Sequence, residues 1–362
     1  MRRSIVTVAF GLLFFMGGVV SPAEADGHGD IASPKVMTLN LYVGADLSSF
    51  NPVQILETIE ATDFEERAAT IAEEIDDRNP DLIGLQEVSD LSVTFGQFGE
   101  PVPGEPQLNY LQILLDELAE RGEHYFVASE VTNAKVSLPL DPDGFVWGNL
   151  IDRDVILARE GTEILSKDSG NYQVNFRVPF PPPPEKPITE IEFTRGWTLV
   201  HAKVDGDEFT FVNTHLEVEP NFETFEGICV VDGPIPCQIP QADELVGILS
   251  KIDNPTILVG DFNAEPGTVA YDIIADAGFV DAWDIRLFGF IPQQENTCCQ
   301  AEDLLNPYSQ LSQRIDIIFI RVDGEAISLS TVFFDRFWEK TPSGLWPSDH
   351  GGVVSTLLYE NP

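Results

Sequence analysis

Lysine and arginine are scarce in this sequence. Its 362 residues include 20 Lys and Arg against 60 Asp and Glu, which gives a formal net charge of −40 at pH 7. A surface with so few cations cannot make the many phosphate contacts on which tight non-specific binding to duplex DNA depends. The composition therefore argues against a dedicated DNA-binding protein. Adaptation to a salty habitat, or simple solubility of a secreted protein, would explain the acidic excess without any functional role.

Cysteine and histidine are also rare, with four and five residues. The cysteine spacing matches no common zinc finger or ribbon, and the histidines lie far away in the sequence, which argues against a zinc site. Four cysteines allow three disulfide connectivities. The loop from Cys229 to Cys237 contains two prolines and one glycine and can bring its ends together, so we expect these two to pair. Cys298 and Cys299 would then be bonded to each other or free.

Long apolar runs are absent except at the N-terminus. Arg2 and Arg3 precede an apolar run over residues 5–20, and small residues suited to signal peptidase follow at 23–25. The run is short and has no stop-transfer flank, so residues 1–25 are interpreted as a secretory signal peptide. We expect a secreted or periplasmic protein, in an oxidising compartment that permits disulfides. Without an internal repeat or a strong linker, residues 26–362 should form a single domain, monomeric and with no obligate protein partner.

Strand-like and helix-like patterns alternate along the remaining sequence. Strands are expected at 35–41, 82–85, 125–131, 154–158, 188–204, 208–213, 256–259, 315–320 and 353–358. Helices are expected at 64–77, with Thr62 as N-cap, and at 108–120, 242–250 and 269–277. The proline-rich stretch at 179–187 must be a loop, because proline cannot donate to a strand ladder. The alternation predicts an α/β fold: a four-layer sandwich of two packed mixed sheets flanked by helices.

Polar residues stand at the ends of several of the apolar runs. They are Asn40 after VMTL, Glu87 after DLIGLQ, His215 after FVNT, Asp261 and Asn263 in LVGDFNAEPG, Asp316 in RIDIIFI, and Ser348, Asp349 and His350 in PSDHGG. A sheet carries an active site on the rim where its strands end, so these groups are candidates for one site. Carboxylates, amides and imidazoles together suit a hard divalent cation and acid–base chemistry at phosphate.

The individual positions suggest separate tasks. Glu87 would end a buried strand, where a carboxylate needs either a metal or an arginine, and arginines are few. Asn40, on the neighbouring strand, can add an amide oxygen to a metal site or orient a water ligand. Asp261 and Asn263 are two residues apart, so on an extended chain they face the same way and suit an attacking water and a phosphate oxygen. An Asx turn is the alternative explanation.

The histidines fall into two groups. His215 and His350 lie at strand ends beside acids or amides, and Asp316 is the natural group to orient His350 and raise its basicity. His28, His124 and His201 lack such a setting and are interpreted as surface or packing residues.

Taken together, the motifs resemble the endonuclease/exonuclease/phosphatase superfamily, which includes deoxyribonuclease I, abasic-site endonucleases, inositol polyphosphate phosphatases and bacterial sphingomyelinases. The segments TLN, LQE, NTHL, GDFN, RID and SDH stand in the family order over residues 36–358. The resemblance implies Glu87 as principal metal ligand, with Asn40 close by and Asp349 at or beside the metal.

The resemblance also implies roles for the remaining motif residues. Asp261 and Asn263 would act at the nucleophile and the phosphate, and His350 with Asp316 would form an imidazole–carboxylate pair. His215 resembles the second catalytic histidine of the deoxyribonuclease and sphingomyelinase branches, although the glutamate that partners it in deoxyribonuclease I has no clear counterpart. Those branches bind the phosphate with an arginine or tyrosine from the middle strands, and Arg153 is the candidate here.

The sequence thus predicts a secreted phosphoesterase that uses Mg²⁺, with Mn²⁺ or Ca²⁺ as alternatives. It would hydrolyse a phosphodiester or phosphomonoester by in-line attack of an activated water. A phospholipid head group, a small phosphate ester or a nucleic acid remains open as substrate. The alternatives are a secreted nuclease that works at high salt and a non-catalytic, calcium-stabilised protein that has kept the fold.

Overall fold

The computed structural model describes residues 31–47, 51–95, 107–141, 143, 145–178, 191–218, 228–229, 236–285, 296–322, 326–333 and 340–360. The expected signal peptide, His28 and the proline-rich loop at 179–187 lie outside these ranges. Within them, no helix combines the length and the apolar character needed to cross a membrane.

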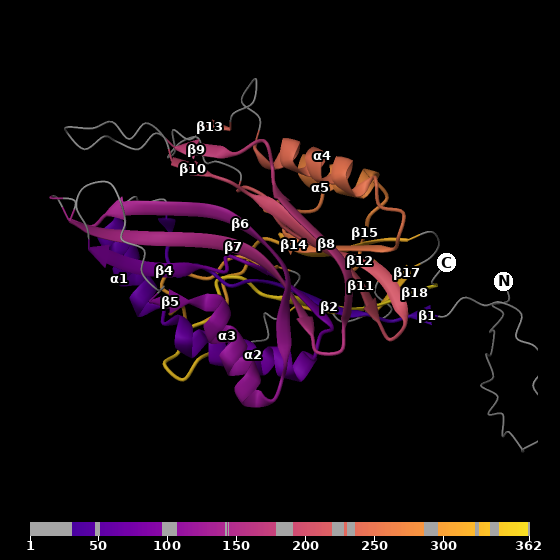
Figure 1. The fold of residues 1–362 in the computed structure, drawn as a ribbon, viewed down its shortest axis with the longest axis horizontal. Helices are drawn as coiled ribbons and strands as arrows, with labels where there is room; N and C mark the ends of the chain where they lie inside the picture. The colour runs from indigo at the N-terminus through magenta and orange to yellow at the C-terminus, as the bar shows by residue number, and fades with distance from the viewer. Residues whose placement is uncertain are drawn as a thin grey trace, which may run out of the picture.

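Two large mixed sheets form the centre of the molecule (Figure 1). The first contains β1 (Ile31–Ala32), β2 (Lys35–Asn40), β3 (Leu82–Gln86), β4 (Asp90–Phe95), β5 (Leu108–Asn109), β6 (Tyr125–Pro139), β7 (Val146–Arg159), β17 (Ala326–Phe333) and β18 (Val353–Glu360). The second contains β8 (Glu163–Asn171), β11 (Gly196–Val204), β12 (Asp207–His215), β14 (Thr256–Asp261), β15 (Val280–Asp281) and β16 (Asp316–Arg321). A small third sheet contains β9 (Phe176–Val178), β10 (Ile191–Phe193) and β13 (Ile228–Cys229). Each large sheet contains one parallel pair, β2 with β3 and β12 with β14, among antiparallel neighbours.

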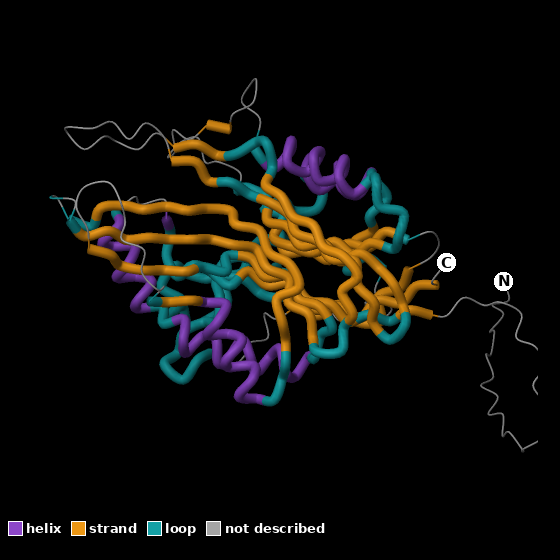
Figure 2. The backbone as a smooth tube through the Cα atoms, in the orientation of Figure 1, coloured by secondary structure: helices purple, strands orange, loops and turns teal. Residues whose placement is uncertain are grey.

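Helices cover the two outer faces of the pair of sheets (Figures 1 and 2). On one side lie α1 (Pro52–Ala61), α2 (Phe64–Arg78) and α3 (Tyr110–Arg121), and on the other lie α4 (Gln238–Leu249) and α5 (Val269–Asp276). The buried apolar residues form three main clusters: between the first helical layer and its sheet, between the two sheets, and between the second sheet and α4 and α5. The four-layer α/β sandwich expected from the sequence is therefore confirmed.

The two sheets approach each other closely at Gly84 of β3. A Cβ atom at this position would lie 2.6 Å from Cγ2 of Val259 and 2.7 Å from Oδ1 of Asn213, both in the second sheet. The Asn213 amide also crosses between the sheets, donating to the carbonyls of Leu85 at 2.9 Å and Val155 at 3.1 Å. These polar links fix the sheets relative to each other close to where their strands end.

Several elements differ from those expected. Helix α1 was not expected, and the Asn51 side chain caps it by accepting from the backbone N of Gln54. The N-cap of α2 is Asp63, which accepts from the backbone N of Glu66, whereas Thr62 turns inward and donates to a buried carbonyl. Strands β6 and β7 extend well beyond 125–131 and 154–158. The sequence does not predict their outer halves, because the side chains there are mostly half-buried or exposed and form no continuous apolar run. Strand β8 was missed because most of its side chains are exposed and polar.

Candidate active site

A cavity of about 980 Å³ opens where strands from both large sheets end. Six of the residues singled out in the sequence line it: Glu87, His215, Asp261, Asn263, Asp349 and His350. Asn40 and Asp316 lie directly behind the wall and bond to these residues. The motifs are spread over some three hundred residues, and the fold brings all of them together except Arg153.

Asn40 connects the carboxylates of the two sheets. Its Nδ2 donates to Oε1 of Glu87 and to Oδ2 of Asp261, both at 3.1 Å. Its Oδ1 accepts from the backbone N of Tyr42 at 2.9 Å, while the N–H of Val43 donates to the second oxygen of Glu87 at 2.8 Å. The amide nitrogen of Asn40 therefore orients the two carboxylates, and the second lone pair of its oxygen leaves it able to act as the metal ligand expected from the sequence.

The backbone at these positions is held in unusual conformations. Tyr42, Glu87 and Asn263 have φ angles of +59°, +54° and +47°, in the left-handed region that non-glycine residues rarely adopt. Gly260 precedes Asp261 with φ of +152°, and a Cβ there would lie 1.9 Å from the carbonyl oxygen of Thr214. Such strain persists only where the surrounding structure fixes it, and it concentrates at functional sites. The turns after β3 and β14 therefore hold the side chains of Glu87 and Asn263 in the cavity wall.

His350 is paired with a buried carboxylate. Its Nδ1 lies 2.8 Å from Oδ2 of Asp316, and the backbone N of Asp316 is in turn fixed by Oγ1 of Thr297 at 3.0 Å. Burial alone would lower the pKa of His350, but the carboxylates of Asp316, Asp349 and Asp261 outweigh it and raise that pKa well above its usual value. In the metal-free protein, His350 is therefore an imidazolium at neutral pH.

His215 has the opposite environment. Its Nδ1 lies 3.2 Å from Nη1 of Arg195, and because a guanidinium has only donors, this nitrogen must accept. The ring proton then sits on Nε2, which lies 3.5 Å from Oδ2 of Asp261. Burial, followed by the positive charges of Arg195 and His350, lowers the pKa of His215 well below its usual value. His215 is therefore a neutral imidazole whose Nε2–H faces the cavity.

The arginine of the cavity is Arg195 and not Arg153. Arg153 pairs with Asp90 at 2.7 Å and does not line the cavity. Arg195 does line it, and Oε2 and Oε1 of Glu217 hold its guanidinium at 3.3 and 3.2 Å. The sequence does not single out Arg195, because the break between β10 and β11 has the pattern of one continuous strand over 188–204. The neighbouring Gly196 pairs with His215, so strand register is the signal that could have identified this arginine.

Two further acids were also missed, both on β7. Asp154 is fully buried, and its Oδ1 lies 3.8 Å from Nδ1 of His215. Burial and then the charge of Asp152 raise the pKa of Asp154 well above its usual value. Burial, followed by the charge of Glu87, raises the pKa of Asp152 to about 7. The sequence around both acids indicates only an apolar strand preceded by polar residues, so it gives no sign that they lie near the cavity.

The cavity wall suits a hard cation. Eight acidic side chains line it, against the single guanidinium of Arg195 among the residues described: Asp46, Glu87, Asp152, Glu217, Asp261, Glu265, Glu302 and Asp349. Oδ1 of Asp349 is buried with no hydrogen-bond partner in the described part of the chain. Asp261, Asp316 and His350 also offer ligand atoms within 4.8 Å of one another. Carboxylate oxygens are the donors that Mg²⁺, Mn²⁺ and Ca²⁺ prefer.

The other expected histidines lie elsewhere, as the sequence indicated. His124 is exposed, and His201 contacts Asn254 and Glu208 without lining the cavity.

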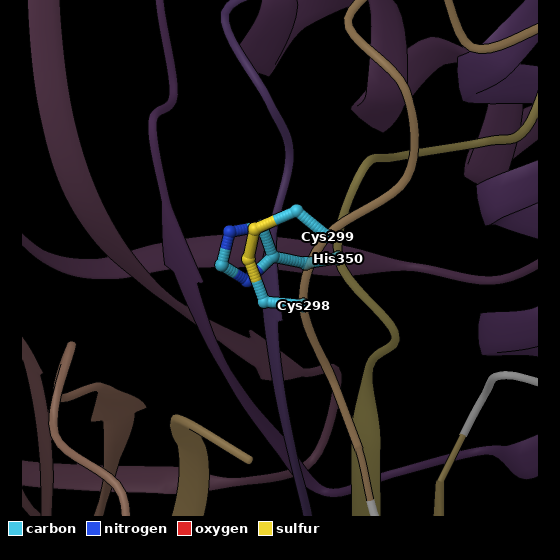
Figure 3. Close-up of side chains that lie close together, drawn as sticks. All are labelled: Cys298, Cys299 and His350. Atoms are coloured by element: carbon cyan, nitrogen blue, oxygen red, sulfur yellow. A yellow bond between two sulfur atoms is a disulfide. The ribbon is translucent and has the colours of Figure 1, made fainter. Parts of the chain in front are cut away.

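The cysteines differ in part from expectation. Cys298 and Cys299 are bonded to each other. Cys237 is also in a disulfide, but its expected pairing cannot be followed because the side chain of Cys229 lies outside the described residues. The histidines are far from the cysteines in the sequence, but in the folded protein His350 lies beside Cys298 and Cys299. Figure 3 shows the Cys298–Cys299 disulfide beside the ring of His350, and their potential ligand atoms lie within 4.8 Å of one another.

Comparison with known proteins gives a consistent picture. The model of the Endonuclease/Exonuclease/phosphatase family matches residues 37–350. No curated protein matches the chain significantly. Among solved structures, an endonuclease/exonuclease/phosphatase family protein from Leptotrichia buccalis C-1013-b is 18% identical, with a TM-score of 0.54, over 90% of this chain and 100% of that one.

Two further similar structures belong to proteins that are named individually. A mannosyl-6-phosphatase from Bacteroides thetaiotaomicron VPI-5482 is 19% identical with a TM-score of 0.50, over 90% of this chain and 100% of that one. A humanized D. rerio TDP2 is 17% identical with a TM-score of 0.50, over 90% and 98%. Identities this low establish the deoxyribonuclease I-like fold alone, but the family match covers most of the sequence. The chain therefore belongs to the endonuclease/exonuclease/phosphatase family, as its motifs suggested.

Proposed function

We propose that this protein is a secreted, Mg²⁺-dependent phosphoesterase that cleaves a P–O bond by in-line attack of an activated water. Hydrolysis of phosphoesters is the activity of its family. The observation that carries the proposal is the pair of histidines in one acidic cavity, both within 4 Å of Asp261, with Asp316 at Nδ1 of His350 and Arg195 at Nδ1 of His215. A metal-binding protein that served only for stability would have no need of this arrangement.

The residues that would hold the cation are Glu87 and Asp349. Asn40 and the N–H of Val43 orient the carboxylate of Glu87, and Asp349 has a buried oxygen free to bind. When bound, the cation would neutralise negative charge on the phosphoryl group. With so many acids around it, the cavity would otherwise repel a phosphate ester.

Asp261 is placed to accept the proton of the attacking water. Asn40 and the backbone N of Asn263 donate to its two oxygens, which fixes the carboxylate. Burial, and then the charge of Asp316, raises the pKa of Asp261 to about 7. A base whose pKa lies near the working pH both exists in its deprotonated form and takes up a proton readily.

The two histidines and Arg195 stabilise the charge that develops during attack. His350, charged and oriented by Asp316, donates to a phosphoryl oxygen. His215 donates from Nε2 while remaining neutral, because Arg195 occupies its other nitrogen. Asn263 is held over the same space by donation to the carbonyl of Leu216 at 2.9 Å. These donors are preorganised and need not reorient as the reaction proceeds.

The charge of the wall favours small or zwitterionic substrates. Among the described residues of the wall, one guanidinium faces eight carboxyl groups, so an extended polyanion would be repelled outside the immediate metal site unless salt screened the interaction. A small phosphate ester or a phosphocholine head group carries less negative charge into the cavity. We therefore place these substrates ahead of nucleic acid.

Turnover by the purified mature protein tests the proposal. The panel contains a sugar monophosphate, bis(p-nitrophenyl) phosphate, sphingomyelin, phosphatidylcholine and plasmid DNA, each with Mg²⁺ or with EDTA, at low and high salt. His350→Ala should abolish metal-dependent turnover, and the matched control His124→Ala changes an exposed histidine far from the cavity lining. Cleavage of DNA alone, and only at high salt, would establish the nuclease instead. Metal binding that raises stability without turnover of any substrate would support the non-catalytic alternative.

A further inference from the structure

The Cys298–Cys299 disulfide forms part of the cavity wall beside the catalytic imidazole. Both cysteines and His350 line the cavity, and their potential ligand atoms lie within 4.8 Å of one another (Figure 3). Cys298 is 1% exposed, whereas Cys299 is at least partly accessible to solvent. The proposed hydrolysis does not involve the Cys298–Cys299 disulfide.

The backbone ties the cysteines to the catalytic loops on both sides. Cys298 pairs with Gln313, which precedes the strand of Asp316, and with His350 itself. The next residues continue the connection, since the backbone N of Gln300 donates to the carbonyl of Asp349 at 2.8 Å. The sulfur atoms are therefore held in a fixed place relative to His350, and their proximity does not depend on a free loop.

The arrangement also meets the requirements of a soft-metal site. Two thiolates and one imidazole are three of the four ligands of a common tetrahedral Zn²⁺ or Cd²⁺ centre. Donor atoms around such an ion lie roughly 3.5–4 Å apart, since metal–sulfur bonds are about 2.3 Å, so small shifts would bring this set together. Asp316 occupies Nδ1 of His350 and leaves Nε2 as the ligand, and a carboxylate on the far nitrogen is the usual support of a metal-binding histidine.

We propose that reduction of the Cys298–Cys299 disulfide creates a second metal site, in which the two thiolates and His350 bind a thiophilic divalent cation and so inhibit the enzyme. The bound cation occupies the imidazole nitrogen that the reaction needs. The site is distinct in chemistry from the oxygen-lined position of Mg²⁺, because it is built from sulfur and nitrogen. The inhibition rests on the proposed function, whereas the metal binding does not.

The chemistry balances with a phosphine as reductant. The S–S bond takes up two electrons and two protons, water supplies the protons and the oxygen, and the phosphine leaves as its oxide. The cation then displaces the two thiol protons and the Nε2 proton of His350, and it forms two metal–sulfur bonds and one metal–nitrogen bond. The disulfide itself cannot act as this ligand pair, so binding follows the redox state of the protein.

Cadmium titration of the full-length mature protein tests the proposal. Oxidised and phosphine-reduced samples, freed of reductant without air, receive Cd²⁺ in the presence of excess Mg²⁺. Binding is followed by thiolate-to-cadmium charge-transfer absorption in the ultraviolet, and turnover is measured on the same samples. The reduced wild type should gain one cadmium site and lose turnover about 10²-fold, the contribution of a catalytic acid or base. The oxidised protein should show neither change.

Two variants assign the site. Cys299→Ser, at an exposed position that tolerates replacement, should lack this cadmium site after the same reduction, and thereby separate it from the disulfide of Cys237. His350→Ala should bind cadmium at least about tenfold more weakly with both thiols still present. Uptake that is equal in oxidised and reduced protein, or unchanged in Cys299→Ser, would overturn the site. Cadmium uptake without loss of turnover would overturn the proposed inhibition. If the oxidised protein has no turnover at all, the proposed function is wrong, and the charge-transfer absorption still shows whether the cadmium site exists.

Discussion

At the scale of single residues, the protonation of the two cavity histidines follows from their partners. Against the effect of burial, the carboxylate of Asp316 at Nδ1 raises the pKa of His350, whereas burial and then the guanidinium of Arg195 at Nδ1 lower the pKa of His215. The two rings lie on either side of the same carboxyl group, Asp261, at 3.8 and 3.5 Å. The site thus contains two histidine proton donors, of which His350 carries a positive charge and His215 is neutral.

Asp316→Asn should separate the orientation of His350 from its charge. The amide still fits beside Nδ1, but it no longer raises the pKa of His350, so the ring loses its proton at a lower pH. We expect kcat to fall about 10²-fold and the alkaline limb of the pH profile to move to lower pH. The measurement is kcat against pH at saturating Mg²⁺. A profile that keeps its wild-type alkaline limb would mean that Asp316 does not set the protonation of His350.

At the scale of elements, one buried arginine fastens the catalytic loops to the helical layer. Arg67 of α2 is fully buried and donates to four backbone carbonyls: those of Thr62 at 2.8 Å, Leu41 at 2.8 Å, Tyr42 at 3.1 Å and Pro347 at 3.0 Å. Two of these follow the strand of Asn40, and Pro347 precedes the loop of Asp349 and His350. The side chain therefore acts as a positioning residue without contacting the cavity.

Arg67→Met should destabilise the protein through these carbonyls. A buried acceptor left without a partner costs about 1–3 kcal/mol, so we expect the free energy of unfolding to fall by at least about 3 kcal/mol. Urea denaturation measures this change. Arg121→Met is the matched control, because its exposed ion pair with Glu73 should contribute less than about 1 kcal/mol. Equal losses in the two variants would contradict the role assigned to Arg67.

Gly84→Ala tests the closeness of the two sheets. The added methyl group would overlap Val259 and Asn213, and overpacking of a core typically costs about 1–3 kcal/mol. Gly247→Ala in α4 is the control, since a Cβ there meets nothing within 4 Å and alanine favours a helix by about 1 kcal/mol. Opposite changes in the midpoint of thermal unfolding are expected. A neutral Gly84→Ala would show that the sheets can move apart without cost.

The elements found from the sequence are those whose pattern is local. Strand β14 and helix α2 carry their apolar runs and periodicity within themselves, so their position could be predicted. The site residues at their ends followed for the same reason, because Asp261 and Glu87 adjoin buried runs. The arginine of the cavity could not be found in this way. Arg195 reaches His215 only through the pairing of β11 with β12, and Arg153, which has the better local context, is turned towards Asp90.

Three acids in or beside the cavity link stability to pH and metal at the scale of the whole molecule. Burial raises the pKa of Asp152, Asp261 and Asp349 from 3.8 to about 7, each with a contribution from neighbouring acids. The folded state therefore holds these protons more tightly than the unfolded state does. Stability of the metal-free protein should fall as pH rises from about 4 to 7, and this loss is complete above pH 7.

Magnesium should reverse that loss. We expect Mg²⁺ to raise the midpoint of thermal unfolding by several degrees at pH 8 and by little at pH 5, where protons compete for the same oxygens. Thermal scans with Mg²⁺ and with EDTA at the two pH values test this. Glu87→Gln is the control variant, in which the difference at pH 8 should shrink. A larger effect at pH 5 would exclude carboxylates as the binding groups.

The Asn40 amide that joins Glu87 of the first sheet to Asp261 of the second has a consequence for folding. Neither sheet alone contains the complete set of proposed catalytic groups, and the Asn40 amide can bond to both carboxylates only when both sheets are in place. A partly folded chain with a single sheet formed is therefore inert, however native that half is. Activity therefore requires that the two sheets have packed together, which brings Glu87 and Asp261 to the same amide.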